Sequence, residues 1–360
     1  MTVIPSCAGD TSGPGLRVVF NQPGDRLQER AVESSIAGFI DRSVAGSTLR
    51  MSFFKYHRPG IHASMLSALE RGVDVRAIFE TRNRDVRRLV QAENDTNDAY
   101  QASLLRDLLE AGALIYDRPR ELGIREVQAH PPTNHNKFIA GSAVRGLDGS
   151  VRPGCLITSA NINDTMRSAY NDCLSIFGEE IVYSNLAAYW SALKEGSVDD
   201  DWSPSTADSA YSLMVYPRSV GDPVYDWLTD GCAVKVRMAI SYWTLNRSEV
   251  VNGLARIRAR GGDVKVVVSL PTYSQPALVD FLMDSGIPVR SVPRMHCKYY
   301  LKELDSGEVE TMTGSHNLTR ASLRDNDELS VAVGGDFVHL AYDRHWNILW
   351  DRGRDLGINR

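Results

Sequence analysis

The sequence predicts an α/β fold made of two pseudo-equivalent halves. Apolar strands alternate with amphipathic helices, the order of these elements occurs twice, and each half carries one copy of a short polar motif. At 360 residues, of which 43% are hydrophobic and 24% charged, the chain is long enough to bury a core in each half. We therefore expect two similar units and a site formed where they meet.

The first half is expected to span residues 16–195, after a lead-in over residues 1–15 that we expect to be flexible. Leu16–Asn21 is an apolar run that predicts a buried strand, and apolar residues at helical spacing in Gln28–Ala45 predict the first helix. Gly72 is placed to end a second helix. The other elements expected here are strands at Met51–Tyr56, Val73–Glu80, Ala113–Tyr116 and Cys155–Ser159, a strand at the motif histidine, and helices at Ile61–Arg71 and Arg84–Leu109.

The second half, expected over residues 210–360, repeats this order. Tyr211–Tyr216 corresponds to the first strand, and Gly261-Gly262 ends a helix as Gly72 does. The other elements expected here are strands at Val234–Trp243, Asp263–Leu270, Ile287–Val292 and Met312–Asn317, a strand at the second motif histidine, and helices at Pro223–Leu228, Val250–Arg260 and Gln275–Ser285.

The two halves differ in length. The spacing between equivalent elements shortens along the chain, so the first half carries extra residues around Arg82–Thr96 and between Asp117 and Pro131. The acidic, Ser/Pro-rich run at residues 196–209 is the expected linker between the halves.

Composition narrows the class of protein. A net charge of -5 and a pI near 5.9 disfavour a broad basic surface for nonspecific nucleic-acid binding. No apolar run reaches membrane-spanning length, and the N-terminus has neither the basic start nor the apolar segment of a secretion signal. The five cysteines are odd in number and widely spaced, which fits neither a disulfide framework nor a zinc site. We expect a cytoplasmic protein without a metal or other cofactor.

Each half contains a histidine, a lysine two residues later, and a Ser-x-Asn farther along. The first copy is His135-Asn136-Lys137 with Ser159 and Asn161, and the second is His296-Cys297-Lys298 with Ser315 and Asn317. Side chains at i and i+2 of a strand share one face, so each His-Lys pair points the same way. Lysine is scarce among the 40 basic residues, which gives the two motif lysines added weight.

Such a set of residues favours an anion as ligand. Two imidazoles, two ammonium groups and two carboxamides around one small volume can donate to phosphoryl oxygens and stabilise charge in the transition state. One imidazole can attack phosphorus while the other protonates the leaving oxygen, and water or an alcohol then takes the phosphoryl group. The pattern predicts metal-independent phosphodiester cleavage or transfer through a covalent phosphohistidine.

These motifs resemble those of the phospholipase D superfamily, in which HxKxxxxD…GSxN occurs twice per active site. The second copy, with Gly314-Ser315-His316-Asn317, is the closer match, because the first has Thr158 where glycine is usual. The resemblance covers nearly the whole chain. It implies two phospholipase D-like halves, each a mixed β-sheet flanked by helices, with the site at their interface in a chain that is active as a monomer.

The resemblance also implies a role for each residue. His135 would be the nucleophile and His296 the general acid, and Glu328 would bond to a ring nitrogen of His296. His135 lacks a matching glutamate in its own copy, and Asp172 is the nearest substitute by sequence. The residues that would bind phosphate are Lys137, Lys298, Asn161, Asn317, Ser159 and Ser315. The aspartate of the family motif is replaced by Ser142 and Glu303, at a position usually regarded as structural.

Several residues also have purely structural interpretations. Asn161 and Asn317 are suited to capping helices, a role compatible with phosphate binding. Alternation along the strand turns Cys297 away from the site, which favours buried filler over an acyl-transfer nucleophile. His316 is expected near the cleft or at the surface, and Tyr242 either in the pocket wall or in the core.

The expected substrate is a phospholipid or another small phosphodiester, with water or an alcohol as acceptor. The alternatives are a phospholipase D-like nuclease, which the acidic pI disfavours, and a biosynthetic phosphotransferase acting on an intracellular metabolite. A noncatalytic anion-binding module is the further alternative. Substrate identity and the choice between hydrolysis and transfer are left open by the sequence.

Overall fold

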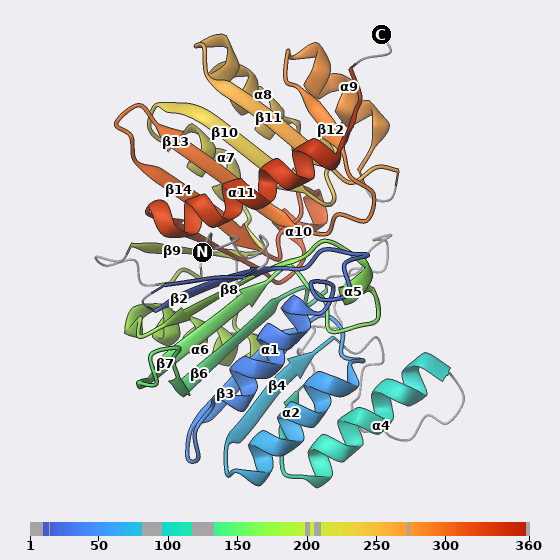
Figure 1. The fold of residues 1–360 in the computed structure, drawn as a ribbon, viewed down its shortest axis with the longest axis vertical. Coiled ribbons are helices and arrows are strands. Elements are labelled where there is room, and N and C mark those ends of the chain that lie inside the picture. The colour runs from blue at the N-terminus through green and yellow to red at the C-terminus, as the bar shows by residue number, and fades with distance from the viewer. Residues whose placement is uncertain are drawn as a thin grey trace, which may run out of the picture.

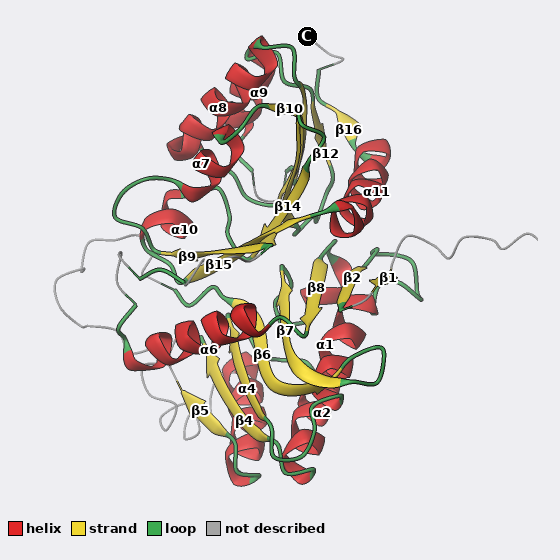
Figure 2. Cartoon of the chain, turned by 90° about the vertical axis from the view of Figure 1, so that its left-hand side faces the viewer, coloured by secondary structure: helices red, strands yellow, loops and turns green. Residues whose placement is uncertain are grey.

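The computed structural model describes residues 10–13, 15–80, 96–116, 133–198, 202–204, 210–271 and 274–357. These residues form two sheets of eight strands, one above the other, each flanked by helices (Figures 1 and 2). The predicted α/β fold with two pseudo-equivalent halves is confirmed. The two extra segments expected in the first half lie outside the described residues, except for Thr96.

The sheet of the N-terminal half combines a parallel part with an antiparallel part. Strands β3, β4 and β5 are parallel because helices α2 (Pro59–Glu70) and α4 (Thr96–Glu110) carry the chain back between them, whereas β6 enters antiparallel to β3. Across the sheet the order is β1 (Asp10–Gly13), β2 (Leu16–Phe20), β8 (Asp172–Phe177), β7 (Val151–Thr158), β6 (Lys137–Arg145), β3 (Thr48–Phe53), β4 (Asp74–Phe79) and β5 (Leu114–Tyr116).

The sheet of the C-terminal half has the same plan. Helices α8 (Ser248–Ala259) and α9 (Pro276–Asp284) connect the parallel strands β10, β11 and β12, and β13 enters antiparallel to β10. The order is β16 (Arg354–Asp355), β12 (Val289–Ser291), β11 (Asp263–Val268), β10 (Ala233–Ile240), β13 (Lys298–Leu304), β14 (Val309–Gly314), β15 (Glu328–Gly334) and β9 (Tyr211–Tyr216). The two orders match from β5 to β2 and from β12 to β9, so β1 and β16 are additions at opposite edges.

Helices cover both faces of each sheet (Figure 2). Helices α1 (Ala31–Asp41), α2 and α4 cover the outer face of the N-terminal sheet, and α7 (Pro223–Thr229), α8 and α9 cover that of the C-terminal sheet. The inner faces carry α6 (Glu180–Glu195) and α11 (Asp336–Arg352). The part of the chain that the structure describes also contains three short elements: α5 (Thr165–Ser168), the 3-10 turn η1 (Leu245–Arg247) and α10 (Arg320–Arg324).

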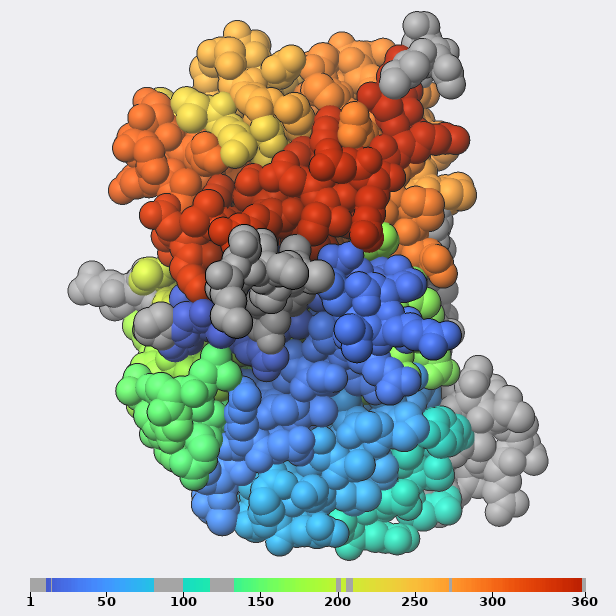
Figure 3. Space-filling view, viewed as in Figure 1, coloured from blue at the N-terminus to red at the C-terminus, as the bar shows by residue number. Residues whose placement is uncertain are grey.

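The two halves share one hydrophobic core across their interface. Helix α11 packs against its own sheet and against β2 of the other half, which brings C-terminal and N-terminal atoms into contact at the front of Figure 3. There the ring of Phe20 stacks on that of His345 with centroids 4.0 Å apart, and the Tyr299 hydroxyl hydrogen-bonds His345 Nδ1 at 2.9 Å. These rings exclude water between the sheets, so the halves are held as one body.

Some elements differ from the expectation. Within the expected lead-in, Asp10–Gly13 form a strand that pairs with β2 and so covers the edge that β2 would otherwise expose. Helices α6 and α11 were not predicted from the sequence. Their signal was present, because Val182, Leu186, Tyr189 and Leu193 recur at helical spacing and are all buried in α6.

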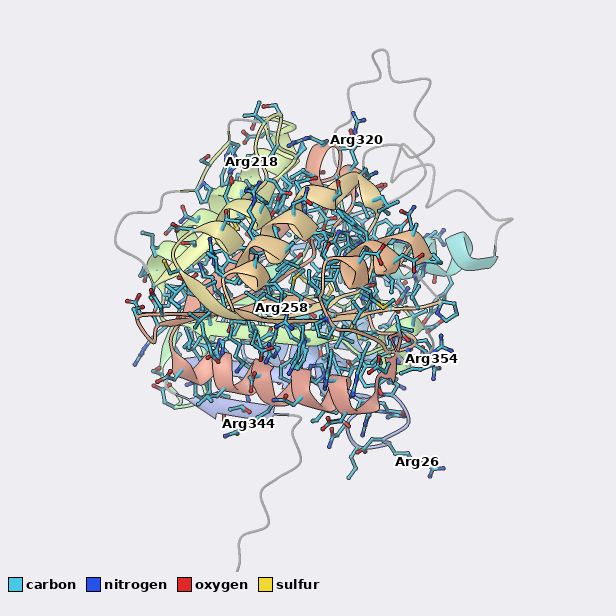
Figure 4. The ribbon with its side chains drawn as sticks, turned by 90° about the horizontal axis from the view of Figure 1, so that it is seen from above. Arg26, Arg218, Arg258, Arg320, Arg344 and Arg354 are labelled. Atoms are coloured by element: carbon cyan, nitrogen blue, oxygen red, sulfur yellow. The ribbon has the colours of Figure 1, made fainter. Side chains whose placement is uncertain are left out.

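No helix in the described part of the chain is long and apolar enough to cross a membrane. The arginines labelled in Figure 4 lie at separate points around the molecule rather than on one face: Arg26, Arg218, Arg258, Arg320, Arg344 and Arg354. These six therefore do not form a single basic surface.

A buried ion pair ties the second motif to the helices behind it. Arg247, which no solvent reaches, forms two-pronged hydrogen bonds with Asp222 at the start of α7, at 2.6 to 2.9 Å. Its guanidinium also donates to the Thr319 carbonyl at 3.3 Å and lies 3.1 Å from His316 Nε2. The pair fixes the loop that follows Asn317.

Replacing Arg247 by methionine should destabilise the protein by about 3–5 kcal/mol, because it leaves the Asp222 carboxylate buried without its partner. Urea denaturation measures this change. The matched control is Arg152→Met, which removes an exposed arginine 3.5 Å from Asp148 and should cost no more than about 1 kcal/mol. Equal losses in the two variants would contradict the importance of the buried pair.

Candidate active site

Each motif histidine lies where its strand meets the opposite half of the molecule. The His135 amide donates to the Asp327 carbonyl at 2.9 Å, and the His296 amide donates to the Tyr170 carbonyl at 2.8 Å. Asn134 and Met295, the preceding residues, form short parallel bridges with the same two partners. The backbones that carry the two imidazoles are therefore fixed by equivalent contacts across the interface.

The His135 side chain is held by a carboxylate from the C-terminal half. Its Nδ1 lies 2.8 Å from Oε2 of Glu328, a residue with no exposed surface. Glu328 also accepts hydrogen bonds from the hydroxyls of Ser315 at 2.5 Å and Ser322 at 2.7 Å. An ionised carboxylate only accepts, so Nδ1 of His135 carries the proton and Nε2 keeps its lone pair.

The His296 side chain is held by an amide from the N-terminal half. Its Nδ1 lies 2.9 Å from Oδ1 of Asn171. The Asn171 amide nitrogen donates to the carbonyls of Met166 at 3.0 Å and Ala169 at 3.1 Å, which leaves Oδ1 as the acceptor. Nδ1 of His296 therefore carries a proton too, and its Nε2 is directed away from this partner.

Two sequence predictions about these partners are wrong. Glu328 does not bond to His296, and Asp172 does not take its place at His135. Asn171 is the structural equivalent of Glu328. The Ser315 amide donates to the carbonyl of Leu329, which follows Glu328, and the Ser159 amide donates to the carbonyl of Asp172, which follows Asn171. The sequence alignment of the two halves matched Asn171-Asp172 with Asn326-Asp327, which is two residues out of register with the structure. It also assumed that each histidine bonds to a residue of its own half, whereas each bonds to a residue of the opposite half.

Asp172 instead joins the halves beneath the site. Its buried carboxylate accepts hydrogen bonds from Thr313 Oγ1 at 2.5 Å and from the Tyr342 hydroxyl at 2.9 Å, both in the C-terminal half. Burial raises the pKa of this carboxyl, although hydrogen bonds from Thr313, Ser159 and Tyr342 oppose that rise. Asp172 thus positions strands rather than the nucleophile.

The two motif lysines are buried and folded back along their strands. Lys137 Nζ donates to the His135 carbonyl and Lys298 Nζ to the His296 carbonyl, each at 2.7 Å. Burial lowers the pKa of Lys298 to about 8, against the raising effect of Glu328 and Asp172. Burial also lowers the pKa of Lys137, and the Lys298 charge lowers it further. Two ammonium groups therefore share one poorly solvated volume, which favours a bound anion.

The imidazoles share that volume. Burial lowers the pKa of His135 to about 4, with Glu328 raising it and Lys137 and Lys298 lowering it. Burial likewise lowers the pKa of His296, and the charges of Lys298, Lys137 and His135 lower it further. Because the charges of each His-Lys pair lower the pKa of the histidine in the other pair, the two pairs lie close together in one site. With these lowered pKa values, both rings are neutral near pH 7 in the free protein.

The asparagines and serines of the motifs divide into two groups. Oδ1 of Asn161 and of Asn317 is buried without a hydrogen-bond partner among the described residues, and neither residue caps the helix that follows. The serine hydroxyls are engaged in the protein: Ser315 donates to Glu328, and Ser159 accepts from the Asp172 amide at 3.0 Å. Because Ser315 donates its only hydroxyl proton to Glu328, its hydroxyl orients the partner of His135 in the free protein, and phosphate binding by Ser315 stays a prediction.

The departures from the family motif have structural explanations. A side chain at Gly314 would place its Cβ 2.2 Å from the Leu329 carbonyl, whereas Thr158 in the same place donates its hydroxyl to the Asp172 carbonyl at 2.6 Å. Ser142 accepts from the Thr48 amide at 2.9 Å, and Glu303 accepts from Lys235 Nζ at 2.6 Å. Ser142 therefore links β6 to β3, and Glu303 links β13 to β10.

The other predicted residues take simpler positions. Cys297 is buried, with its thiol directed at the Tyr170 carbonyl, and His316 is buried with its ring stacked 3.9 Å from that of Tyr216. Tyr242, two residues after the end of β10, is 40% exposed. In the described part of the chain, no cluster of three or more His, Cys, Asp or Glu side chains is arranged to hold a metal ion.

Sequence reasoning missed Phe54 and Lys55, which follow β3. The Phe54 ring centre lies 5.1 Å from that of His135 and 5.7 Å from Lys137 Nζ, so it forms an apolar wall on this side of the site. Lys55 Nζ lies 5.4 Å from the same ring centre. No motif marks these positions, and only the pairing of β3 with β6 brings them to the histidine.

Comparisons with known proteins agree with this architecture. Residues 230–350 match the family model described as "Cardiolipin synthase, PLD-like domain". No curated protein matches the sequence.

Solved structures resemble the whole fold at low identity. Phosphatidylserine synthase from Haemophilus influenzae Rd KW20 is 12% identical, with 94% of this chain and 87% of that chain covered and a TM-score of 0.64. Polyphosphate kinase from Porphyromonas gingivalis is also 12% identical, with 93% of this chain covered and a TM-score of 0.62. This chain spans only 47% of that kinase. The C-terminal half thus matches a PLD-like domain, and the solved structures share the two-half fold of the whole chain.

Proposed function

We propose that this protein is a phosphodiesterase or phosphatidyl/phosphoryl transferase that works through a phosphohistidine on His135. The observation that carries the proposal is the pair of imidazoles, each with Nδ1 fixed by a partner from the opposite half and each beside a buried ammonium group. The match of residues 230–350 to a PLD-like domain supports the general kind of reaction. Such a site needs no metal ion for the steps below.

The two histidines differ in a way that assigns their roles. The Glu328 carboxylate stabilises the positive charge that His135 acquires when its Nε2 bonds to phosphorus. The Asn171 amide is neutral and offers His296 less stabilisation of the protonated ring. A protonated ring with a neutral partner gives up its proton more readily. His135 is therefore the nucleophile and His296 the general acid.

The first step exchanges one bond at phosphorus for another. The lone pair on Nε2 of His135 attacks phosphorus, and the bond from phosphorus to the leaving oxygen breaks on the opposite side. The leaving oxygen keeps that electron pair and takes the proton from Nε2 of His296. In the second step His296 removes a proton from water or an alcohol, whose oxygen attacks phosphorus, and the bonding pair returns to His135.

Substrate binding itself prepares the general acid. In the free protein, burial and the lysine charges keep the pKa of His296 low. A bound phosphodiester brings a negative charge between Lys137 and Lys298, which offsets their charges and favours protonation of His296. Asn161 and Asn317 follow β7 and β14, and in this proposal their amide groups donate to the nonbridging oxygens.

One chain supplies both half-sites, so a monomer is sufficient for activity. We place the division between the halves within residues 196–209, because α6 ends at Glu195 and β9 begins at Tyr211. The proposed substrate is a small phosphodiester, such as a phospholipid, with water or an alcohol as acceptor.

Replacing either His135 or His296 by alanine should lower the turnover of a 4-nitrophenyl phosphodiester by roughly 10³-fold or more, because each ring takes part in making or breaking a bond. Circular dichroism and thermal melting should show the native fold in both variants. With chelator present, the wild type should retain its activity and form a label on His135 that is stable to alkali and lost in acid. Substantial turnover by either variant would argue against a shared site.

Replacing Glu328 by glutamine should slow formation of the phosphoenzyme by about 10²- to 10⁴-fold, because an amide can stabilise the wrong tautomer of His135. Single-turnover kinetics with a labelled substrate measures this step directly. Glu303→Gln is the matched control, since Glu303 bonds to Lys235 and not to a histidine of the site. A phosphoenzyme formed at the wild-type rate in Glu328→Gln would reject the assigned roles.

Affinity for sulfate, a probe with constant charge, should fall above pH 8. Lys298 has a pKa of about 8 in the free protein, so its charged fraction falls about fivefold from pH 8 to pH 9 and about tenfold from pH 9 to pH 10. Isothermal titration calorimetry between pH 6 and 10 measures the affinity. Lys298→Met should bind sulfate weakly at every pH, and Lys265→Met, at a surface lysine of β11, should bind like the wild type. A flat profile in the wild type would contradict the role of Lys298.

A further inference from the structure

The residue that holds His296 is itself held by a buried asparagine. Asn21 directly follows β2 and has no exposed surface. Its Oδ1 accepts a hydrogen bond from the Asn171 backbone amide at 2.7 Å, and its own backbone amide donates to the Asn171 carbonyl at 3.1 Å. Asn21 Nδ2 donates to the Met166 carbonyl at 2.6 Å. Asn21 therefore fixes both ends of the segment that leads from α5 to Asn171.

That segment determines which way the Asn171 side chain faces. Its Nδ2 donates to the carbonyls of Met166 at 3.0 Å and Ala169 at 3.1 Å, and its Oδ1 lies 2.9 Å from Nδ1 of His296. Turning the amide over would place Oδ1 against two carbonyls and Nδ2 against the ring N–H, so both contacts would become repulsive. The Met166 carbonyl is therefore the contact through which Asn21 acts on the side chain that orients His296.

A buried carboxylate anchors the helix that carries this carbonyl. Arg167, the next residue of α5, donates from Nε to Glu33 of α1 at 2.6 Å. The Glu33 side chain is 7% exposed and also accepts from the Arg58 guanidinium at 3.1 to 3.2 Å. Charge-assisted hydrogen bonds of this kind are stronger than neutral ones. Two guanidinium groups on one carboxylate thus hold α5 and the Met166 carbonyl in place.

The nucleophile's side is built differently. Hydroxyl groups donate to Glu328, whereas carbonyl groups accept from Asn171. The position equivalent to Asn21 holds Tyr216, which pairs with Glu328 between β9 and β15 and stacks its ring on that of His316. Hydroxyl donors suit a carboxylate and carbonyl acceptors suit an amide. The arrangement around Asn21 therefore serves the His296 side of the site rather than both sides.

We propose that Asn21 is a positioning residue for general-acid catalysis by His296 and acts through Asn171. This inference rests on the proposed function. A fixed Asn171 keeps the His296 ring turned so that the Nε2 proton faces the leaving oxygen. A strongly basic leaving oxygen needs this proton as its bond to phosphorus breaks, whereas a weakly basic one departs with little help. Asn21 should therefore matter most for poor leaving groups.

Two substrates that differ only in the leaving group test the proposal: methyl 4-nitrophenyl phosphate and methyl phenyl phosphate. Both form the same phosphoenzyme, so the release of the phenol in a single turnover isolates the first step. Asn21→Ala should slow release from the phenyl ester by about ten- to a hundredfold and from the 4-nitrophenyl ester by less than about threefold, because 4-nitrophenolate is the weaker base.

A second variant tests the same chain of contacts from the surface. Arg167→Gln removes a side chain that is 30% exposed, and it leaves Glu33 paired with Arg58, so the native fold should be retained. Because α5 is then held less firmly, release from the phenyl ester should again fall more than release from the 4-nitrophenyl ester, by a smaller factor than in Asn21→Ala.

The controls separate this inference from the proposed function. Asn136→Ala removes a buried asparagine on the nucleophile's side, 3.1 Å from the Tyr189 hydroxyl, and should change both rates by the same factor. A wild type that releases neither phenol contradicts the proposed function itself. If the wild type releases both, equal losses on the two esters in Asn21→Ala and Arg167→Gln, or no loss, overturn the role of Asn21 alone. A loss confined to the phenyl ester in Asn136→Ala would also overturn it.

Discussion

The structure depends on an exchange of hydrogen bonds between the halves. Glu328 of the C-terminal half orients His135, and Asn171 of the N-terminal half orients His296. Backbone bridges at Asp327 and Tyr170 repeat the exchange beside each ring. Neither half contains a complete site, because each supplies the partner that the histidine of the other requires. Docking of the halves and assembly of the site are therefore the same event.

The shared core makes this exchange possible. Phe20, Tyr299 and His345 fill the interface with stacked and hydrogen-bonded rings, and Asp172 joins it through Thr313 and Tyr342. The core excludes water from the base of the site. The resulting burial is the largest cause of the lowered pKa values of both motif histidines and both motif lysines. Packing thus sets the chemistry as well as the stability.

The departures from exact symmetry are informative. The equivalent positions hold a carboxylate at Glu328 and an amide at Asn171. In the mechanism that we propose, this difference separates the histidine that accumulates positive charge from the one that releases a proton. A duplicated fold supplies two similar half-sites, and single substitutions at matched positions give them different roles.

The sequence by itself determined the two-half α/β fold and the two His-x-Lys motifs, because hydrophobic periodicity and residue spacing are local properties. It also gave the buried position of Cys297, which follows from alternation along a strand. It did not determine the partners of the histidines, since Glu328 and Asn171 reach them only after the two sheets have packed together. The location of Phe54 and Lys55 near His135 was decided by tertiary structure for the same reason. It depends on the pairing of β3 with β6, a long-range contact that no local pattern encodes.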